Sequence, residues 1–484
     1  MTPEPRSAIG SRILARPTPD GWSVHAVEYE VPLERSVVVD RLVGENLSLA
    51  IDEDGFSVAA DGPLRFRPGA TALDGAAGGG DSRLREVSGP LRFGLDGRWH
   101  PIPADEHARA AAAEAAAWRD WMARRPAVAP AFADVVERCW RTLGENTLRL
   151  RSRPDVLAIV PSLAGYVGAW QWDSYFIAVG LRHGDPALAR DQLRLVTDPQ
   201  SPDGQLPDVV HDGGVLAGSE DLPEADRASL AHAGSPYLGQ RVPLTKPPLL
   251  AWAADLVNRV APHEAFTARM FERARANHAW WFADSSVAGV PYYRHPYSSG
   301  LDDSPVFDAP CGPTPDLLAY LAAGERVLAA HRPSWANAAR QSLLVGALRE
   351  RADGDTIVAL LGLFGGFLDA PRVAALAAAI DDPARFGGRW RLPTVSRASA
   401  AYAPRRLWRG PVWVNTNVLV AEGLRASGRP ELAKRLERET LALVDRFGPW
   451  EYFDSANGGP GEGAVSSFSW SAALAVDLAV RLSR

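Results

Sequence analysis

Two carboxylates set among aromatic residues are the side chains in this sequence best suited to acid–base chemistry. Asp173 lies in GAWQWDSYF (168–176), and Glu451 lies between Trp450 and Tyr452, ahead of a glycine-rich stretch. Aromatic rings exclude water from a carboxyl group and favour its protonated form, whereas a position at the start of a helix favours the anion. An acid and a base are therefore one interpretation. A helix cap for Asp173 and a structural role for Glu451 are the alternatives.

Two further loops combine polar and aromatic residues without a helical period. PYYRHPYSSGLDDSPVFD (291–308) includes His295 and Asp302, and RRLWRGPVW (405–413) includes Arg409. Such groups can hold the hydroxyls and the C–H face of a sugar, although a hydrogen-bonded surface loop is the alternative. With two carboxylates far apart in sequence, the set suits cleavage of a glycosidic bond, in which one carboxyl protonates the leaving oxygen and the other activates water.

Other classes of function lack support in the sequence. It has no HExxH, paired CxxC, EF-hand, dinucleotide-binding, P-loop or GxSxG pattern, so we expect no metal and no cofactor. The formal charge of −6 offers no basic field for nucleic acid. The opening MTPEPRSAIGSR has no apolar core and no apolar run is long enough to span a membrane, which predicts a cytoplasmic protein. The expected partner is a small carbohydrate, and a homo-oligomer is left open.

The pattern of elements changes near residue 104. Residues from about 20 to 100 alternate as short strands, and LDGAAGGGDSR (73–83) is typical of a flexible loop. Helical segments then follow roughly in pairs, separated by long polar–aromatic loops. We expect a mainly α protein, with a β-rich region over 1–103 and an (α/α)6-barrel catalytic domain over 104–484. An open α-solenoid is the alternative, but no recurring unit is present.

The expected helices number close to twelve and are recognised by their apolar periodicity and terminal signals. They lie near 105–125, 130–146, 174–183, 185–197, 246–260, 264–283, 314–331, 333–350, 371–380, 412–426, 430–446 and 466–482.

In this order, the loops resemble the motifs of glycoside hydrolase family 63 and its bacterial relatives, the mannosylglycerate and glucosylglycerate hydrolases, over roughly residues 130–484. WDSYF is similar to WDS/T-x-F, and WRGPVWVNTN follows WRGPVW-x-N-x-N almost letter for letter. HPYSSGLDDSP resembles HPWESGxDNSP, and WEYFD followed by FSW resembles the C-terminal motif. TKPP (245–248) resembles a QPP segment, and SPDGQLP (201–207) resembles a loop lining the pocket.

The resemblance implies an (α/α)6 barrel without a metal requirement, in which Asp173 is the general acid, Glu451 the general base and Asp302 a group that grips the sugar. The predicted function is that of an inverting α-glycosidase acting on a small α-glucoside or α-mannoside, such as a glycosylglycerate or short oligosaccharide. A trehalase-like or other α/α-barrel sugar enzyme and an inactive carbohydrate-binding barrel are the alternatives. The predicted substrate-binding residues are Trp170, Trp172, Tyr175, Gln205, Lys246, His295, Tyr297, Asp302, Trp408, Arg409, Trp413, Trp450, Tyr452 and Trp470.

Four positions depart from the family pattern beside the expected sugar site. Lys246 stands where relatives usually have Gln, Ser298 where they have Glu, Tyr297 where they have Trp, and Asp303 where they have Asn. An added ammonium and a lost carboxylate make that end of the pocket more positive. We therefore expect Lys246 to contact an anionic group or a distinct hydroxyl pattern, with an outward salt bridge to a local acid as the alternative.

Overall fold

The computed structural model describes residues 5–31, 35–53, 55–68, 85–94 and 99–484, and the predicted loop at 73–83 lies outside them. Packing divides the chain into two units. The first contains Met1–Arg125, Trp140–Gly168 and His211–Gly213, and the second contains Pro126–Cys139, Ala169–Val210 and Gly214–Arg484. The domain boundary expected after residue 103 stays a prediction, while packing places the helix that follows it in the first unit.

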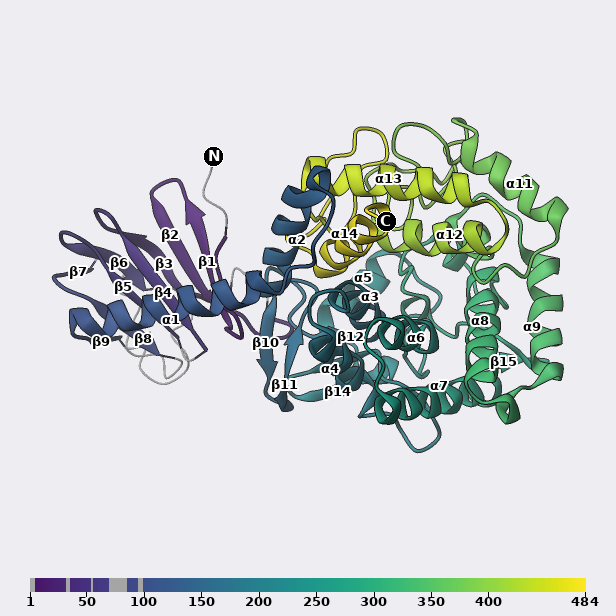
Figure 1. Ribbon diagram of the computed structural model, residues 1–484, viewed down its shortest axis with the longest axis horizontal. Helices are drawn as coiled ribbons and strands as arrows, with labels where there is room; N and C mark the ends of the chain where they lie inside the picture. Colours follow the sequence, from purple (N-terminus) through teal and green to yellow (C-terminus); the bar gives the residue numbers. More distant parts are fainter. Residues whose placement is uncertain (1–4, 32–34, 54, 69–84, 95–98) are drawn as a thin grey trace. The chain divides into compact units, whose positions relative to one another are not determined.

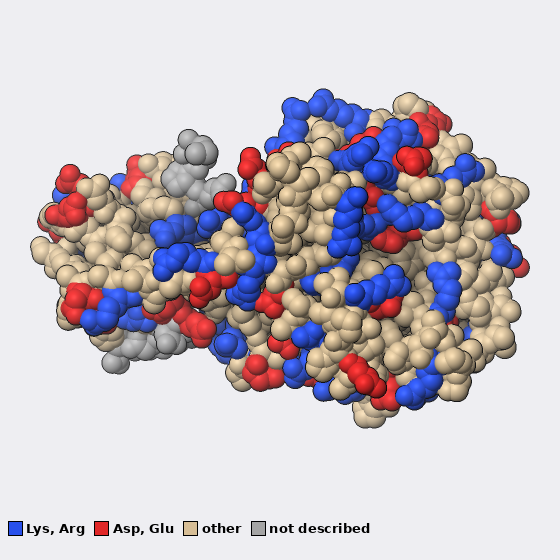
Figure 2. All heavy atoms as spheres, in the orientation of Figure 1, with Lys and Arg blue, Asp and Glu red and all other residues tan. Residues whose placement is uncertain are grey.

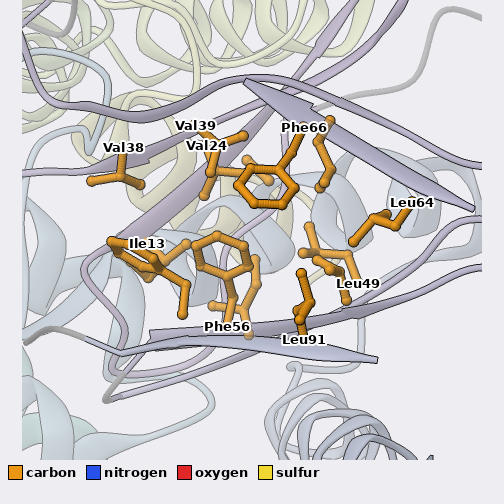
Figure 3. Packing of buried hydrophobic residues seen from close by; sticks show 14 of the residues in the cluster. Ile13, Val24, Val38, Val39, Leu49, Phe56, Leu64, Phe66 and Leu91 are labelled. Atoms are coloured by element: carbon orange, nitrogen blue, oxygen red, sulfur yellow. The ribbon is translucent and has the colours of Figure 1, made fainter. Parts of the chain in front are cut away.

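The first unit contains two antiparallel sheets with a shared apolar core, which confirms the predicted β-rich region. Ile13, Val24, Phe56 and Phe66 are among the residues packed between the sheets (Figure 3). One sheet has the order β1-β2-β3-β6-β7 and the other β4-β5-β8-β9. The strands are β1 (Ile13–Thr18), β2 (Gly21–Ala26), β3 (Val37–Val43), β4 (Ser48–Asp52), β5 (Gly55–Ala59), β6 (Leu64–Pro68), β7 (Arg85–Val87), β8 (Leu91–Gly94) and β9 (Trp99–Pro101).

Helix α1 (Ala104–Ala123) packs against β4 and β5 of this unit. Ile51 N donates to the Glu114 carboxylate over 2.9 Å, and His107 Nδ1 lies 2.9 Å from Ser57 Oγ. These polar contacts fix the helix on the sheet. A separate hairpin is formed by β10 (Thr147–Leu150) and β11 (Arg153–Ile159).

The second unit is an (α/α)6 barrel, as predicted (Figure 1). Within the described residues, each inner helix contacts the next, and α14 returns to contact α3. The inner helices are α3 (Gln171–Leu181), α6 (Leu250–Val260), α8 (Pro315–His331), α10 (Ile357–Leu361), α12 (Val414–Ala426) and α14 (Ser469–Leu482). The outer layer contains α2 (Ala133–Glu145), whose first part belongs to this unit, α4 (Pro186–Thr197), α7 (Glu264–Asp284), α9 (Ala338–Arg351), α11 (Ala370–Asp381) and α13 (Pro430–Phe447).

Short elements lie in the connecting loops. They are β12 (Ala169–Trp170), β13 (Val209–His211), β14 (Gly214–Leu216), β15 (Ser286–Val287), β16 (Val290–Pro291) and α5 (Glu224–His232), with 3-10 turns η1 (Pro130–Phe132), η2 (Ser219–Asp221), η3 (Pro296–Ser299), η4 (Pro305–Phe307) and η5 (Pro333–Trp335). In the described part of the chain, no helix has the length and apolar character needed to cross a bilayer.

The sequence-based helix list needs three corrections: it places the helix at 105–125 in the barrel, it lacks α5 (Glu224–His232), and it lacks one inner helix. The predicted helix at 105–125 is confirmed as α1, but it belongs to the first unit and not to the barrel. The missing inner helix is α10, a five-residue IVALL segment that is buried throughout. Burial on every side removes the polar–apolar period by which a helix is recognised in sequence, so this segment gave no signal.

The inner helices run in the same direction and present different chemistry at their two ends. Their N-terminal ends carry Asp173, Trp413 and Trp470, whereas Arg182 and Arg481 lie at the C-terminal ends of α3 and α14. Basic groups are favoured at helix C-termini by the backbone dipoles. Figure 2 shows basic side chains gathered over α6, α12 and α14, where a cavity of about 670 Å³ is lined by Arg182, Arg481 and other charged residues.

Closure of the ring depends on a close approach between α3 and α14 at Gly180. A Cβ atom added there would lie 2.2 Å from the carbonyl oxygen of Ala473, so a backbone would have to move. We predict that Gly180→Ala lowers the free energy of unfolding by about 1–3 kcal/mol or more, because overpacking strains a close-packed interface. Urea or thermal unfolding measures the loss.

The matched control is Gly346→Ala in α9. An added Cβ there meets no atom within 4 Å, and the residue is exposed. This variant should gain up to about 1 kcal/mol from better helix propensity. Equal effects of the two substitutions would contradict a packing constraint at the α3–α14 contact.

Candidate active site

A strand pair sets the start of α3 and with it the position of Asp173. Trp170 pairs with Val209 in the β12–β13 ladder, and Gln171 N donates to Asp208 O over 2.9 Å. The helix therefore begins at Gln171, with Trp170 as its N-cap and no side-chain cap. Asp173 is the third helical residue, so the alternative of a helix cap is wrong.

The buried carboxyl group of Asp173 favours its protonated form. Only 4% of the residue is exposed, and burial is the largest influence raising its pKa. Lys246 acts in the opposite direction, whereas the charges of Glu451 and Asp208 raise the pKa further. The pKa of Asp173 therefore lies well above 3.8, although the residue lies in the first turn of a helix. Desolvation thus outweighs the charge of Lys246, and the raised pKa suits an acid role.

Glu451 is held by the glycine-rich segment that follows it. Val465 N donates to Glu451 Oε2 over 3.2 Å, and Glu451 N donates to Val465 O over 2.9 Å. The neighbouring Tyr452 hydroxyl donates to the carbonyl of Glu462, and an added Cβ on Gly461 would lie 2.3 Å from the Tyr452 ring. Glycine is therefore needed for close approach of the loop to the ring, and the hydrogen bond from Val465 N holds the Glu451 carboxylate in place.

Lys246 is buried among these carboxyl groups. Its Nζ donates to Tyr297 O over 2.6 Å and lies 3.0 Å from Asp208 Oδ1. Its backbone N donates to Gln171 Oε1 over 2.9 Å, which fastens the TKPP segment to the start of α3. The ion pair with an acid that the alternative foresaw is present, but the residue is 5% exposed, so the pair is buried and not directed outward.

The carboxyl groups nearest to Lys246 also have raised pKa values. Burial is the main cause for both Asp208 and Asp302, whose pKa values are raised to about 6 and about 7, even though Lys246 lowers each of them. Oδ1 of Asp302 is buried and has no hydrogen-bond partner among the described residues. An unpaired buried acceptor costs free energy, and a hydrogen bond from a ligand to this atom would remove that cost.

His295 provides a donor on the same loop as Asp302. Tyr297 N donates to His295 Nδ1 over 3.2 Å, so in the neutral ring the proton lies on Nε2. Burial, together with the charge of Lys246, lowers the His295 pKa to about 4. Nε2 is buried without a partner in the described structure. The loop at 295–302 therefore contributes one free donor and one free acceptor.

The predicted aromatic residues pack mainly on one another. Trp408 and Trp413 stack with ring centroids 3.6 Å apart, and Tyr452 stacks on Trp413 at 4.6 Å. Trp172 meets Trp470 edge to face at 5.4 Å, next to Asp173 in the chain. Each of these rings is almost fully buried, as is Tyr175. They form one apolar cluster that includes Trp172 in the first turn of α3, while direct contact with a sugar stays a prediction.

Three predicted binding residues have other partners. Gln205 Nε2 donates to the carbonyls of Ala217 and Leu244, over 2.7 and 2.8 Å. Arg409 binds Asp308 through both terminal nitrogens of its guanidinium. Trp450 donates from Nε1 to Phe447 O over 2.9 Å. These contacts give each side chain a structural role, and a role in substrate binding stays a prediction.

Sequence reasoning missed two residues of the polar network. Gln171 joins Lys246 N, Thr245 Oγ1 and the Tyr175 hydroxyl, and Asp208 is the ion-pair partner of Lys246. Asp208 directly follows the SPDGQLP segment, and its position beside that motif was the available signal. In the part of the chain that the structure describes, no three His, Cys, Asp or Glu side chains are grouped in a way that could hold a metal ion.

The barrel brings together two buried carboxyl groups from distant motifs: Asp173 lies in the first turn of inner helix α3, and the charge of Glu451, in the loop before α14, raises its pKa. This fold and site define the class of (α/α)6-barrel glycoside hydrolases. The chain belongs to the family of the mannosylglycerate hydrolase MGH1-like glycoside hydrolase domain, which it matches over residues 166–347 and 325–471. The protein is accordingly a glycoside hydrolase, as predicted.

Individual relatives support the assignment. The chain is 28% identical over 411 residues to a mannosylglycerate hydrolase of Thermus thermophilus, covering 66% of this chain and 95% of the relative. It is 25% identical over 445 residues to one from Selaginella moellendorffii, covering 72% and 86%. A solved structure of a family 63 mannosylglycerate hydrolase from Thermus thermophilus, in complex with Tris and D-glycerate, has 26% identity and a TM-score of 0.57, covering 70% of this chain and 98% of that one. The predicted resemblance to family 63 is confirmed.

The raised pKa of Asp302 predicts a gain of stability on neutralising this residue. Because its pKa rises from 3.8 to about 7 on folding, ionised Asp302 destabilises the folded state by up to roughly 4 kcal/mol above about pH 7. The penalty falls as pH decreases toward about 4. Asp302→Asn should therefore raise the unfolding midpoint at about pH 8.5 more than at about pH 5.5, measured by thermal unfolding.

The control is Asp477→Asn, which should have the opposite sign. The pKa of Asp477 is lowered to about 2, because its ion pair with Arg182 and its contact with His183 outweigh burial. Its ionised form stabilises the fold above about pH 4, so removing the charge should lower the midpoint at about pH 8.5. A loss of stability in Asp302→Asn at alkaline pH would contradict the electrostatic interpretation of Asp302.

Proposed function

We propose that the protein hydrolyses the glycosidic bond of a small α-glycoside whose reactive sugar is neutral, with inversion at the anomeric carbon. The observation that carries this proposal is the buried carboxyl group of Asp173, whose pKa lies well above 3.8 and which responds to the charge of Glu451. A protonated carboxyl and a carboxylate in one pocket can act as acid and base in a single displacement. The mechanism uses side chains and water only.

Asp173 donates its proton to the glycosidic oxygen as the bond from that oxygen to the anomeric carbon breaks. The surrounding tryptophans support this role, because they leave little water to stabilise the Asp173 anion before the reaction. Glu451 accepts a proton from a water molecule whose oxygen attacks the anomeric carbon from the opposite face. After the step Asp173 is ionised and Glu451 is protonated, and exchange with solvent restores both groups.

The charges of the pocket favour a neutral sugar at the reactive position. Four acidic residues, Asp173, Asp208, Asp302 and Glu451, share it with one ammonium group, that of Lys246. The carboxylate of a uronic-acid sugar would be buried among these acids at a high electrostatic cost. An α-mannoside or α-glucoside of glycerate, or a short oligosaccharide, fits this constraint. The mannosylglycerate hydrolases among the relatives support the glycerate linkage.

Removing either carboxyl group should abolish turnover without unfolding the protein. We predict that Asp173→Asn and Glu451→Gln each reduce kcat by about 10²–10⁴-fold or more, because each removes one proton-transfer group. Steady-state kinetics with circular dichroism measures both properties. Glu431→Gln, an exposed change in α13, is the control that should retain activity. Near-normal kcat in either carboxyl variant would reassign the roles.

The stereochemistry of the product tests the mechanism separately. Proton NMR of the first-formed sugar should show the β-anomer from an α-linked substrate, because one displacement inverts the anomeric carbon. The screen should contain mannosyl- and glucosyl-glycerates, trehalose and short α-glucans. Release of the α-anomer would exclude a single displacement. Hydrolysis of trehalose alone would favour a trehalase, and sugar binding without turnover would favour a binding protein.

A further inference from the structure

The charge of Lys246 acts on the neighbouring ionisable side chains, Asp173, Asp208, Asp302 and His295. The ammonium is buried, pairs with Asp208 at 3.0 Å and donates to Tyr297 O over 2.6 Å. Burial opposes its charge, but Asp208, Asp302 and Asp173 outweigh this effect, and the pKa of Lys246 lies above its ordinary value.

Two of the groups that Lys246 influences have a buried atom without a hydrogen-bond partner among the described residues. Asp302 Oδ1 and His295 Nε2 are buried and unpartnered among the described residues, and the charge of Lys246 acts on both groups. A carboxylate acceptor and an imidazole donor on the same loop complement the hydroxyls of a sugar, which both donate and accept. The acceptor requires Asp302 to be ionised, and burial disfavours that state.

We propose that Lys246 is a positioning residue that sets the charge of Asp208 and Asp302, so that Asp302 is an anionic acceptor for a hydroxyl of the bound neutral sugar. The inference rests on the proposed function and deepens it. His295 Nε2–H donates to the same hydroxyl or to its neighbour. An uncharged side chain at position 246 could fill the space, but it would leave the buried acids without a counter-charge.

Several charged groups face this cluster and determine the signs of the effects. Asp173 approaches from α3, Asp208 from the segment before β13, and Asp302 from the loop after η3. Glu451 acts on Asp173, and Asp226 of α5 raises the pKa of both Asp208 and Asp302. Arg406 and Arg409 bind Asp303, the neighbour of Asp302. Lys246 lowers the pKa of Asp302, whereas Asp208 raises it. Removing the charge of Lys246 and removing that of Asp208 should therefore shift the pKa of Asp302 in opposite directions.

The pH dependence of kcat/KM in a set of three variants tests this inference. The substrate is the best glycoside found for the wild-type enzyme, and the isosteric changes are Lys246→Met, Asp208→Asn and the double variant. We expect Lys246→Met to move the rising limb of kcat/KM about one pH unit or more toward alkaline pH, with KM affected more than kcat. Asp208→Asn should move the limb toward acid, and the double variant should lie between them.

The signed pattern separates an electrostatic role from a structural one. A residue that only fills space would lower activity by the same factor at every pH. The double variant removes both members of the Lys246–Asp208 ion pair and so guards against misfolding of either single variant. The inference would be overturned if the wild-type enzyme is active but the rising limb of kcat/KM does not move in Lys246→Met. It would also be overturned if both single variants move this limb in the same direction. A wild-type protein that cleaves no glycoside would instead refute the proposed function.

Discussion

Burial of ionisable groups in one pocket is the constraint that the rest of the barrel must satisfy. Asp173, Asp208 and Asp302 are all shielded from water strongly enough to raise their pKa values, and Lys246 is the buried cation that offsets them. Such a site opposes folding and has to be compensated by packing elsewhere. The compensation comes from inner helices that are apolar on nearly every side, with α3 buried over its full length.

Polar contacts between distant segments give the pocket its geometry. The β12–β13 pair brings Asp208 to the start of α3, and Gln171 then binds the backbone of Lys246. The 3-10 turn η3 adds the carbonyl of Tyr297 as the second partner of the ammonium. Asp173 therefore comes from the first turn of α3, whereas Asp208 and Asp302 come from two different loops. Pre-organisation of this kind allows electrostatic effects to act without reorganisation during the reaction.

The sequence predicts the barrel and the two central carboxyl groups because the signals are local. Aromatic residues flank Asp173 and Glu451 within a few positions, and most helices have clear periods and ends. Asp208 could not be assigned as the partner of Lys246, because their contact depends on pairing between segments separated in the chain. Arg409 shows the reverse limit: its type suits sugar binding, but Asp308, remote in sequence, occupies its guanidinium. Contacts of this kind follow from the tertiary fold and leave no local pattern.

The contact between α3 and α14 also has a consequence for synthesis and damage of the protein. Asp173 lies on the first helix of the inner ring, and Glu451 comes shortly before the last one. A nascent chain therefore carries Asp173, the proposed proton donor, early, but the ring of inner helices closes only when α14 has emerged and docked beside Gly180. A proteolytic cut just after α13 would remove Glu451, the proposed proton acceptor, together with the neighbour of α3. Both proposed catalytic groups are consequently present together only in a chain that includes α14.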